Sequence, residues 1–114
     1  MKLWERLKEK EFEAIFKDAY RYYGKYIVIF VSPKVKRKVG FVASKKIGPA
    51  HKRNRAKRLM REAFLKVEPI LNEDVSFILI ARPAIVGVKM QDVLNDLEGF
   101  VFKFKKGHKD REEA

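Results

Sequence analysis

The sequence predicts an α+β fold: a single domain with a small central sheet and three helices packed on it. Three segments carry apolar residues at helical spacing, and three others are rich in β-branched and aromatic residues. No repeat, linker or low-complexity stretch divides the 114 residues, which are enough for one modest core.

The N-terminal half predicts one helix and two strands. A helix is expected over residues 12–23, where apolar side chains recur at i, i+3, i+4, i+7, i+8 and i+11. Those side chains belong to Phe12, Ile15, Phe16, Ala19, Tyr20 and Tyr23. Gly24 is expected to end this helix. Residues 26–32 and 39–44 are expected to be strands, and the short basic connection at 33–38 favours an antiparallel arrangement of the two.

The C-terminal half predicts two more helices around a buried strand. A helix is expected over residues 56–67, ended by Pro69, with an apolar face made of Ala56, Leu59, Met60, Ala63, Phe64 and Val67. The nearly continuous apolar run at 76–82 is typical of a strand buried on both faces. A third helix is expected over 90–104, followed by a polar tail at 105–114 that is expected to fray.

Positive charge is concentrated in one part of the chain. Residues 19–61 contain fourteen Lys or Arg and no Asp or Glu, whereas the formal net charge of the whole chain is +12. The remaining residues therefore sum to −2, because 12 − 14 = −2. A concentrated positive field on a small domain indicates a polyanionic partner, most often nucleic acid. A charged face that serves only solubility usually mixes both signs, so the nucleic-acid hypothesis is favoured.

The composition excludes several other classes of protein. There is no Cys, which excludes disulfides, thiolate zinc sites and cysteine nucleophiles and favours a reducing compartment. No apolar run approaches the ~20 residues of a membrane-spanning helix, and the first residues are too charged for a secretory signal. We therefore expect a cytoplasmic protein with no membrane partner. A charged fraction of 37%, together with the lack of Cys, favours a thermophilic source.

The segment at residues 44–64 carries the most specific pattern. On the expected helix, at ~3.6 residues per turn, its polar residues lie opposite the apolar face. The polar residues concerned are Asn54, Arg55, Lys57, Arg58 and Arg61. Like charges three or four positions apart destabilise a helix by about 0.2–0.5 kcal/mol per pair, a local cost that is expected at a functional surface. Among these polar residues three are Arg and one is Lys, and Arg suits bidentate phosphate contacts.

Taken in order, Ser-Lys-Lys-Ile-Gly at 44–48 followed by Lys-Arg-Asn-Arg-x-Lys-Arg-x-x-Arg at 52–61 resembles the bacterial ribonuclease P protein subunit. The resemblance extends to residues 11–17 and 77–83 and so covers nearly the whole chain. It implies a central mixed sheet flanked by three helices, with a left-handed βαβ crossover between parallel strands. Pattern alone would favour the right-handed sense, which occurs in about 98% of such connections.

The resemblance also implies a function and its sites. The family binds the catalytic RNA of ribonuclease P and the 5′ leader of precursor tRNA, and it aids endonucleolytic removal of the leader. The residues that match its catalytic-RNA surface are Arg53, Asn54, Arg55, Lys57, Arg58 and Arg61. Those that match its leader-binding cleft, between the first helix and the sheet, are Phe12, Phe16, Phe30, Lys46, Arg53 and Asn54. Aromatic side chains beside cations suit sequence-tolerant binding of a single strand, although spacing alone would assign the three Phe to the core.

The protein itself is not expected to carry catalytic residues. His51 could be a general acid or base, but a lone His among cations is more often an RNA contact or a helix-start residue. Asp92, Asp96 and Glu98 are more simply explained as a solvated helix face than as a metal site, because a two-metal nuclease needs converging carboxylates. By the resemblance, the RNA carries the chemistry with Mg²⁺, and the protein needs no organic cofactor, bound metal or obligate protein partner.

Three alternatives to this function stay open: an RNA-binding module, a nuclease and, least favoured because no turn-helix pair precedes the basic helix, a DNA-binding protein. A non-catalytic RNA-binding module, such as a small ribosomal protein, would have an equally basic composition. A self-contained nuclease would cleave without any RNA subunit. Binding that prefers precursor tRNA over mature tRNA would favour the ribonuclease P hypothesis over the first alternative.

Overall fold

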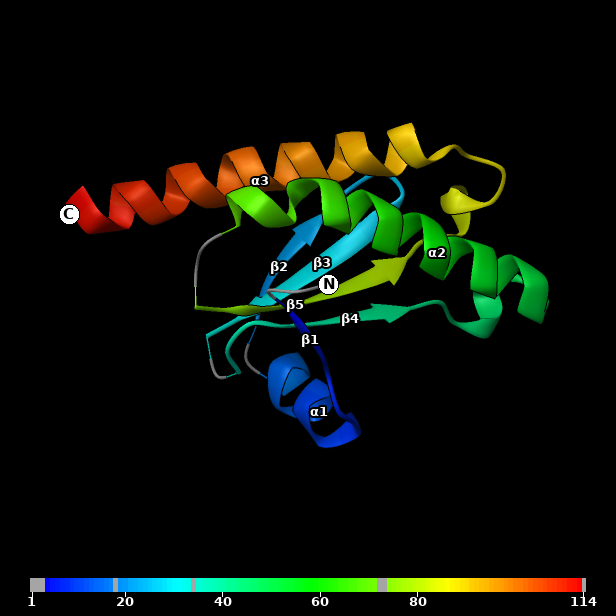
Figure 1. Ribbon diagram of the computed structural model, residues 1–114, viewed down its shortest axis with the longest axis horizontal. Coiled ribbons are helices and arrows are strands. Elements are labelled where there is room, and N and C mark those ends of the chain that lie inside the picture. The colour runs from blue at the N-terminus through cyan, green and yellow to red at the C-terminus, as the bar shows by residue number, and fades with distance from the viewer. Residues whose placement is uncertain (1–3, 18, 34, 72–73, 114) are drawn as a thin grey trace.

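In the computed structural model, the described residues are 4–17, 19–33, 35–71 and 74–113, the last seven as backbone only. Three helices surround a five-stranded mixed sheet, so the predicted α+β class is confirmed (Figure 1). In chain order the elements are β1 (Glu5–Arg6), α1 (Glu9–Lys17), β2 (Tyr20–Tyr23), β3 (Ile27–Ser32), β4 (Lys38–Val42), η1 (Lys45–Ile47), α2 (Ala50–Val67), η2 (Glu68–Ile70), β5 (Ser76–Ala81), η3 (Pro83–Ile85) and α3 (Met90–Glu113), where η marks a 3-10 turn.

The sheet is built around β5, the strand predicted to be buried on both faces. The strand order is β1-β4-β5-β3-β2. β5 runs parallel to β4 and antiparallel to β3, and all its residues except Ile80 are buried. β3 and β4 run in opposite directions, as the sequence predicts, but β5 lies between them and they do not pair. The chain passes from β4 through α2 to β5, which is the βαβ crossover between parallel strands; its left-handed sense stays a prediction from the resemblance.

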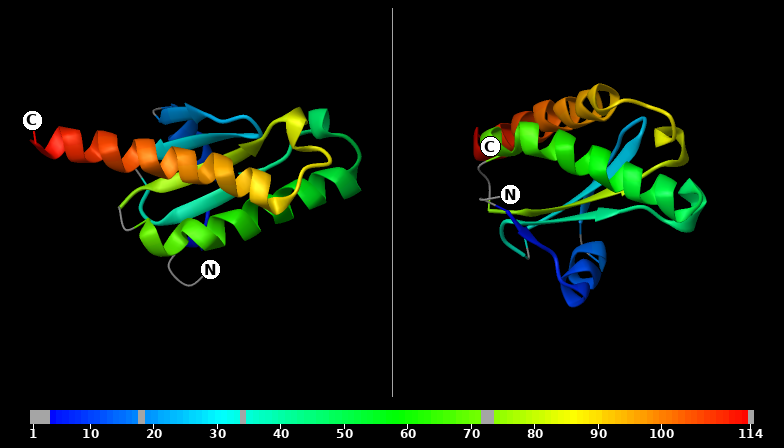
Figure 2. Two further views of the ribbon diagram at one scale, coloured as in Figure 1. Left: turned by 90° about the horizontal axis from the view of Figure 1, so that it is seen from above. Right: turned by 45° about the vertical axis from the view of Figure 1, so that its right-hand side comes forward.

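The helices cover the two faces of the sheet unequally. α2 and α3 lie side by side on one face, and α1 lies on the other (Figures 1 and 2). The larger core lies under α2 and α3, and its largest buried side chains include Trp4, Phe64, Phe77 and Phe100. The core under α1 has three buried residues, Ile15, Phe30 and Ile78. Alternation along β5 supplies both cores, because Phe77 and Ile78 point to opposite faces.

The predicted helix over residues 12–23 is wrong in its second half. α1 ends at Lys17, and Tyr20–Tyr23 forms β2, which pairs with β3. Tyr20 and Tyr23 fit the helical spacing by coincidence: both are exposed, whereas the half-buried Tyr22 packs against Phe100 with ring centroids 5.5 Å apart. An aromatic-rich segment of four residues can pair as a strand even when its spacing matches a helix face.

Two N-terminal features were not predicted from the sequence. β1 has only two residues, which is too short to give a periodic signal, and it pairs in parallel with β4. Trp4, directly before it, is 1% exposed, and its ring lies 5.1 Å from that of Phe77 and 5.8 Å from that of Phe64. Trp4 thus anchors β1 to the main core. At the other end, α3 continues to Glu113, and fraying of residues 105–114 stays a prediction.

α1 is fastened to the sheet by an ion pair and by one close ring contact. The Glu11 carboxylate accepts hydrogen bonds from Lys38 Nζ and from the backbone N–H of Lys8, both at 2.8 Å. The Phe12 ring lies on Gly40 of β4 so closely that a Cβ at this position would collide with it. Gly40 therefore allows the helix to approach the sheet.

A carboxylate of α3 organises the turn between β2 and β3. Oxygens of Asp96 accept hydrogen bonds at 3.1, 2.6 and 3.2 Å from the backbone N–H groups of Lys25, Tyr26 and Ile27. Gly24 is required beside it, because a Cβ there would lie 2.7 Å from Asp96 Oδ2. Arg82 Nη1 donates to the Gly24 carbonyl at 2.7 Å. The expectation that Asp96 lies on a solvated face is therefore wrong: the turn needs acceptors for its N–H groups, and Asp96 supplies them.

Asp96→Ala is expected to lower the free energy of unfolding by about 2–3 kcal/mol, because three backbone donors lose a charged acceptor. Asp92→Ala is the matched control. Its carboxylate accepts one N–H, from Lys89 at 2.9 Å, and its loss is expected to cost about 0.5–1 kcal/mol. Urea denaturation followed by circular dichroism measures both. Equal losses in the two variants would contradict this role for Asp96.

The attachment of α1 is expected to weaken in acid. The hydrogen bond from Lys38, followed by that from the Lys8 backbone, lowers the pKa of Glu11 below its ordinary value of 4.5. A lowered carboxyl pKa stabilises the folded state above pH 4.5, and this stability is lost as the pH falls through the folded-state pKa. The hydrogen bond to Glu11 likewise raises the pKa of Lys38, so the pair is retained through neutral pH and is lost in strong alkali.

Glu11→Gln is therefore expected to flatten the loss of stability between pH 6 and pH 3. Glu13→Gln is its control, because Glu13 is exposed on the same helix. Urea midpoints measured across this range for both variants test the pair. If Glu13→Gln flattened the profile as much as Glu11→Gln, the ion pair would not be the cause.

Candidate nucleic-acid interface

α2 separates an apolar face from a cationic one, as the sequence predicts. The six predicted core residues, from Ala56 to Val67, are all buried. Asn54, Arg58 and Arg61 are exposed, whereas Arg53, Arg55 and Lys57 are half-buried. The helix begins at Ala50, six residues before the first predicted apolar position. These six N-terminal residues extend the cationic surface by a turn and a half.

The cations of α2 differ in what they contact. Arg55 Nη2 donates to the Val88 carbonyl at 2.8 Å and so ties α2 to the loop before α3. The Arg61 guanidinium lies 5.7 Å from the centroid of the Phe41 ring. Arg58 and Glu62 are 4.0 Å apart, and since both are at least half exposed this pair contributes little to stability. Arg58 thus contributes little to the stability of the domain itself.

Arg53 has an unusual environment among the predicted RNA-binding residues. Its Nε is buried, and within the described part of the chain it has no hydrogen-bond acceptor. An unsatisfied buried donor costs about 1–3 kcal/mol, which a partner with an acceptor oxygen would recover if it could reach the group.

Three aromatic side chains predicted for the leader cleft lie together on the α1 face of the sheet. The ring centroids of Phe12 and Phe16 are 6.3 Å apart, and those of Phe16 and Phe30 are 5.1 Å apart. Phe16 is 37% exposed, whereas Phe30 is only 9% exposed. We refer to Phe12, Phe16 and Phe30 as the aromatic cluster. Phe16 is its accessible member, and the other two support it.

Arg21 is a candidate residue that the sequence did not predict. Its guanidinium carbon lies 4.9 Å from the centroid of the Phe30 ring. Arg21 pairs directly with Phe30 in the register of β2 and β3. The helical spacing of Tyr20 and Tyr23 led to the prediction of a helix there, in which Arg21 has no relation to Phe30. A strand at residues 20–23 would have placed Arg21 beside the cluster.

The other predicted cleft residues lie away from the aromatic cluster. Arg53 and Asn54 belong to α2, which covers the opposite face of the sheet (Figure 2). Lys46 is exposed in η1, which connects β4 to α2. Within the described part of the chain, β1 pairs with Lys38 and Val39 of β4 and does not extend along the rest of that strand. The structure thus brings the three aromatics together and places the three polar residues on η1 and α2.

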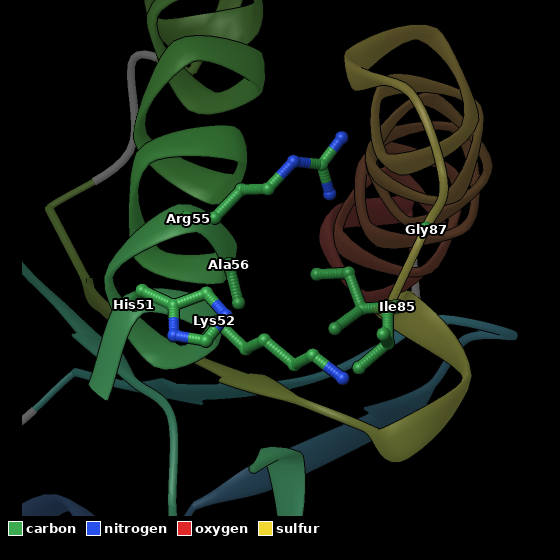
Figure 3. A pocket seen from close by; sticks show the side chains of 7 residues that line it. His51, Lys52, Arg55, Ala56, Ile85 and Gly87 are labelled. Atoms are coloured by element: carbon green, nitrogen blue, oxygen red, sulfur yellow. The ribbon is translucent and has the colours of Figure 1, made fainter. Parts of the chain in front are cut away.

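The described residues offer no metal site and no membrane segment. They contain no group of three or more His, Asp or Glu that could bind a metal ion. In the same part of the chain, no helix has the length and apolarity needed to cross a membrane. His51 is exposed in the first turn of α2, where it lines a hollow together with Lys52 and Arg55 (Figure 3).

Comparison with known sequences gives one consistent family. The model of the family described as Ribonuclease P matches residues 1–105. The "Ribonuclease P protein component" of Pediococcus pentosaceus is 39% identical over 99 residues, which cover 84% of this chain and 82% of that protein. The protein of the same name from Shouchella clausii is 35% identical over 109 residues, covering 92% of this chain and 89% of its own length.

Solved structures agree with the sequence relatives. The RNase P protein of Staphylococcus aureus superposes with a TM-score of 0.72 at 30% identity, covering 89% of this chain and 94% of that one. The RNase P protein of Thermotoga maritima gives a TM-score of 0.73 at 25% identity, with coverage of 84% and 94%. Both the sequence and the arrangement of its elements therefore show that this chain belongs to the ribonuclease P protein family.

Proposed function

We propose that this member of the ribonuclease P protein family acts as the protein subunit of the holoenzyme, which removes the 5′ leader of precursor tRNA. Its partners would be the catalytic RNA and the precursor tRNA. The observation that carries the proposal is the acid-free stretch of residues 19–61, which supplies both the cationic face of α2 and Arg21 beside the aromatic cluster. The relatives support this function rather than that of a small ribosomal protein.

The face of α2 is the proposed surface for the catalytic RNA. Asn54, Arg58 and Arg61 are exposed, so they can contact phosphates without a change in the fold. Arg and Lys contacts to phosphates fix position without reading sequence, and folded RNA is recognised largely through its shape and backbone. A rigid helix that presents several cations on one side suits this task.

The aromatic cluster is the proposed surface for the single-stranded leader. Phe16 offers an accessible ring on which a base can stack, and Arg21 places a positive charge beside Phe30. Stacking on aromatic side chains is tolerant of sequence, because every base has a π face. Leaders of different sequence could then be bound at the same site.

The chemistry is proposed to reside in the RNA, with Mg²⁺ bound there. The described residues show no converging carboxylates for a two-metal mechanism, which supports a positioning role for the protein. The protein contributes a formal net charge of +12. Fixed positive charge can replace part of the diffusible cation atmosphere around the RNA, so the protein is expected to lower the magnesium requirement.

Reconstitution at low magnesium tests this function directly. A bacterial ribonuclease P RNA and a 5′-extended precursor tRNA are incubated with and without the full chain, at a magnesium concentration where the RNA alone is nearly inactive. Cleavage at the mature 5′ end is expected only when protein is present. Cleavage by the protein without RNA would instead favour a protein nuclease, and an unchanged magnesium requirement would refute the electrostatic mechanism.

Arg58→Ala is expected to weaken binding to ribonuclease P RNA and to reduce the slope of log K against log salt by about 0.7–0.9 for each phosphate that Arg58 neutralises. The unfolding transition should stay unchanged, because the pair with Glu62 is weak. Lys66→Ala removes an exposed cation in the last turn of α2 that is not among the predicted RNA contacts, so it is the control and should leave the slope near that of the original protein. Filter binding over a salt series measures the slopes, and equal slopes for the two variants would place Arg58 off the RNA.

Phe16→Ala is expected to reduce the preference for precursor tRNA over mature tRNA by about 1–3 kcal/mol, the value of one stacked base. Phe102→Ala is the matched control, because Phe102 is 70% exposed on α3 and distant from α1 in the fold. Dissociation constants for both tRNAs, each measured with the reconstituted holoenzyme, give the preference. A Phe16→Ala protein with normal melting and an unchanged preference would remove Phe16 from the site.

A further inference from the structure

A hollow of about 290 Å³ opens between the first turns of α2 and the chain that follows η3. Figure 3 shows α2 on one side and the segment around Ile85 and Gly87 on the other, with Lys52 extended toward Ile85. Its lining residues are His51, Lys52, Arg55, Ala56, Ile85, Val86 and Gly87. The roles proposed for Arg58, Arg61 and the aromatic cluster do not involve this hollow, because none of these residues lines it.

The floor of this hollow is apolar and its rim is cationic. Ala56 and Ile85 are buried at 2% and 1% exposure, while Val86 is 42% exposed. Lys52, Arg55 and the His51 imidazole come from α2, and no carboxylate lines the hollow. Such a site favours a ligand that combines an apolar flat surface with negative charge.

Arg55 is fixed in the wall of this hollow rather than free to swing. One of its Nη2 hydrogens is donated to the Val88 carbonyl. A guanidinium has five N–H donors, so several donors remain for an anion that approaches the rim. A side chain held in this way loses little rotamer freedom when it binds.

We propose that the hollow takes one unstacked nucleotide of the RNA that lies along α2. Its base would enter between His51 and the apolar pair Ile85 and Val86, and its flanking phosphates would lie at Lys52 and Arg55. The inference rests on the proposed function, since it assumes RNA on the cationic face of α2, with which the hollow is continuous along the helix. Unpaired bases of folded RNA are commonly received by side chains with flat faces.

Val86→Glu tests the site by placing a carboxylate at its mouth. Ile70→Glu is the matched control: Ile70 is also exposed and β-branched, lies beyond the other end of α2, and gives the same change of charge. Relative to Ile70→Glu, Val86→Glu is expected to bind ribonuclease P RNA about 5- to 150-fold more weakly, the range for one stacked base. Both variants should melt like the original protein. Equal affinity in the two variants would overturn the proposal.

His51→Ala adds a second, independent readout. A stacking contact neutralises no phosphate, so the loss of the His51 ring is expected to weaken RNA binding with an unchanged salt slope, in contrast to Arg58→Ala. A reduced slope would show a phosphate contact in place of stacking and would overturn the proposed role of His51. If the original protein itself did not bind the RNA, the proposed function would fail; normal binding with equal Val86→Glu and Ile70→Glu affinities would refute only the nucleotide site.

Nuclear magnetic resonance with small probes distinguishes base from phosphate. Adenosine 5′-monophosphate is expected to shift the methyl signals of Ile85 and Val86 upfield through its ring current. Ribose 5-phosphate carries the same phosphate without a base and is expected to leave these methyl signals in place. Identical responses to the two probes would mean a phosphate site only, and no response to either would mean that the hollow does not accept a nucleotide; both results would overturn the proposal.

Discussion

The pairing of β5 with strands on both sides is the constraint on which the rest of the molecule depends. β5 is parallel to β4 and antiparallel to β3, and its alternate side chains enter different cores. Phe77 and Leu79 meet α2 and α3, and Ile78 meets α1. Because one strand contributes to both layers, the cationic helix and the aromatic cluster are held at a fixed distance on opposite sides of a single sheet.

Burial of the apolar face of α2 offsets the repulsion between like charges on its cationic face. Like charges along α2 disfavour the helix, and its N-cap residue, Pro49, makes no side-chain capping hydrogen bond. The opposite face buries Leu59, Met60 and Phe64 against the sheet and α3. Burial of a large apolar side chain stabilises by about 1.5–3 kcal/mol, which exceeds the repulsion of any one pair several-fold. Packing therefore lets α2 carry cations that its local sequence would not favour.

Residue spacing and composition correctly predicted the elements that depend on local sequence. They did not predict contacts between residues that are far apart in the chain. The apolar face of α2 and the two-sided burial of β5 follow from spacing and composition, and both are confirmed. The roles of Asp96 and Arg21 depend on pairing across the fold: Asp96 binds Tyr26, seventy residues earlier in the chain. A single sequence carries no signal for such a contact. The family resemblance assigned Phe12, Phe16 and Phe30 to one site, and their rings lie close together. Residue spacing alone favoured ordinary core positions for them.

The unequal size of the two cores has a consequence for how the family can change. Among the described residues, only Ile15, Phe30 and Ile78 are buried under α1, whereas the core under α2 and α3 contains Trp4, Phe77 and many others. Elements with little buried apolar surface open at a lower free-energy cost than the domain as a whole. Substitutions on α1 itself, such as at Ile15, are therefore expected to weaken this attachment more than they destabilise the core under α2 and α3. The side that carries the aromatic cluster can then vary while the cationic helix α2 stays in place.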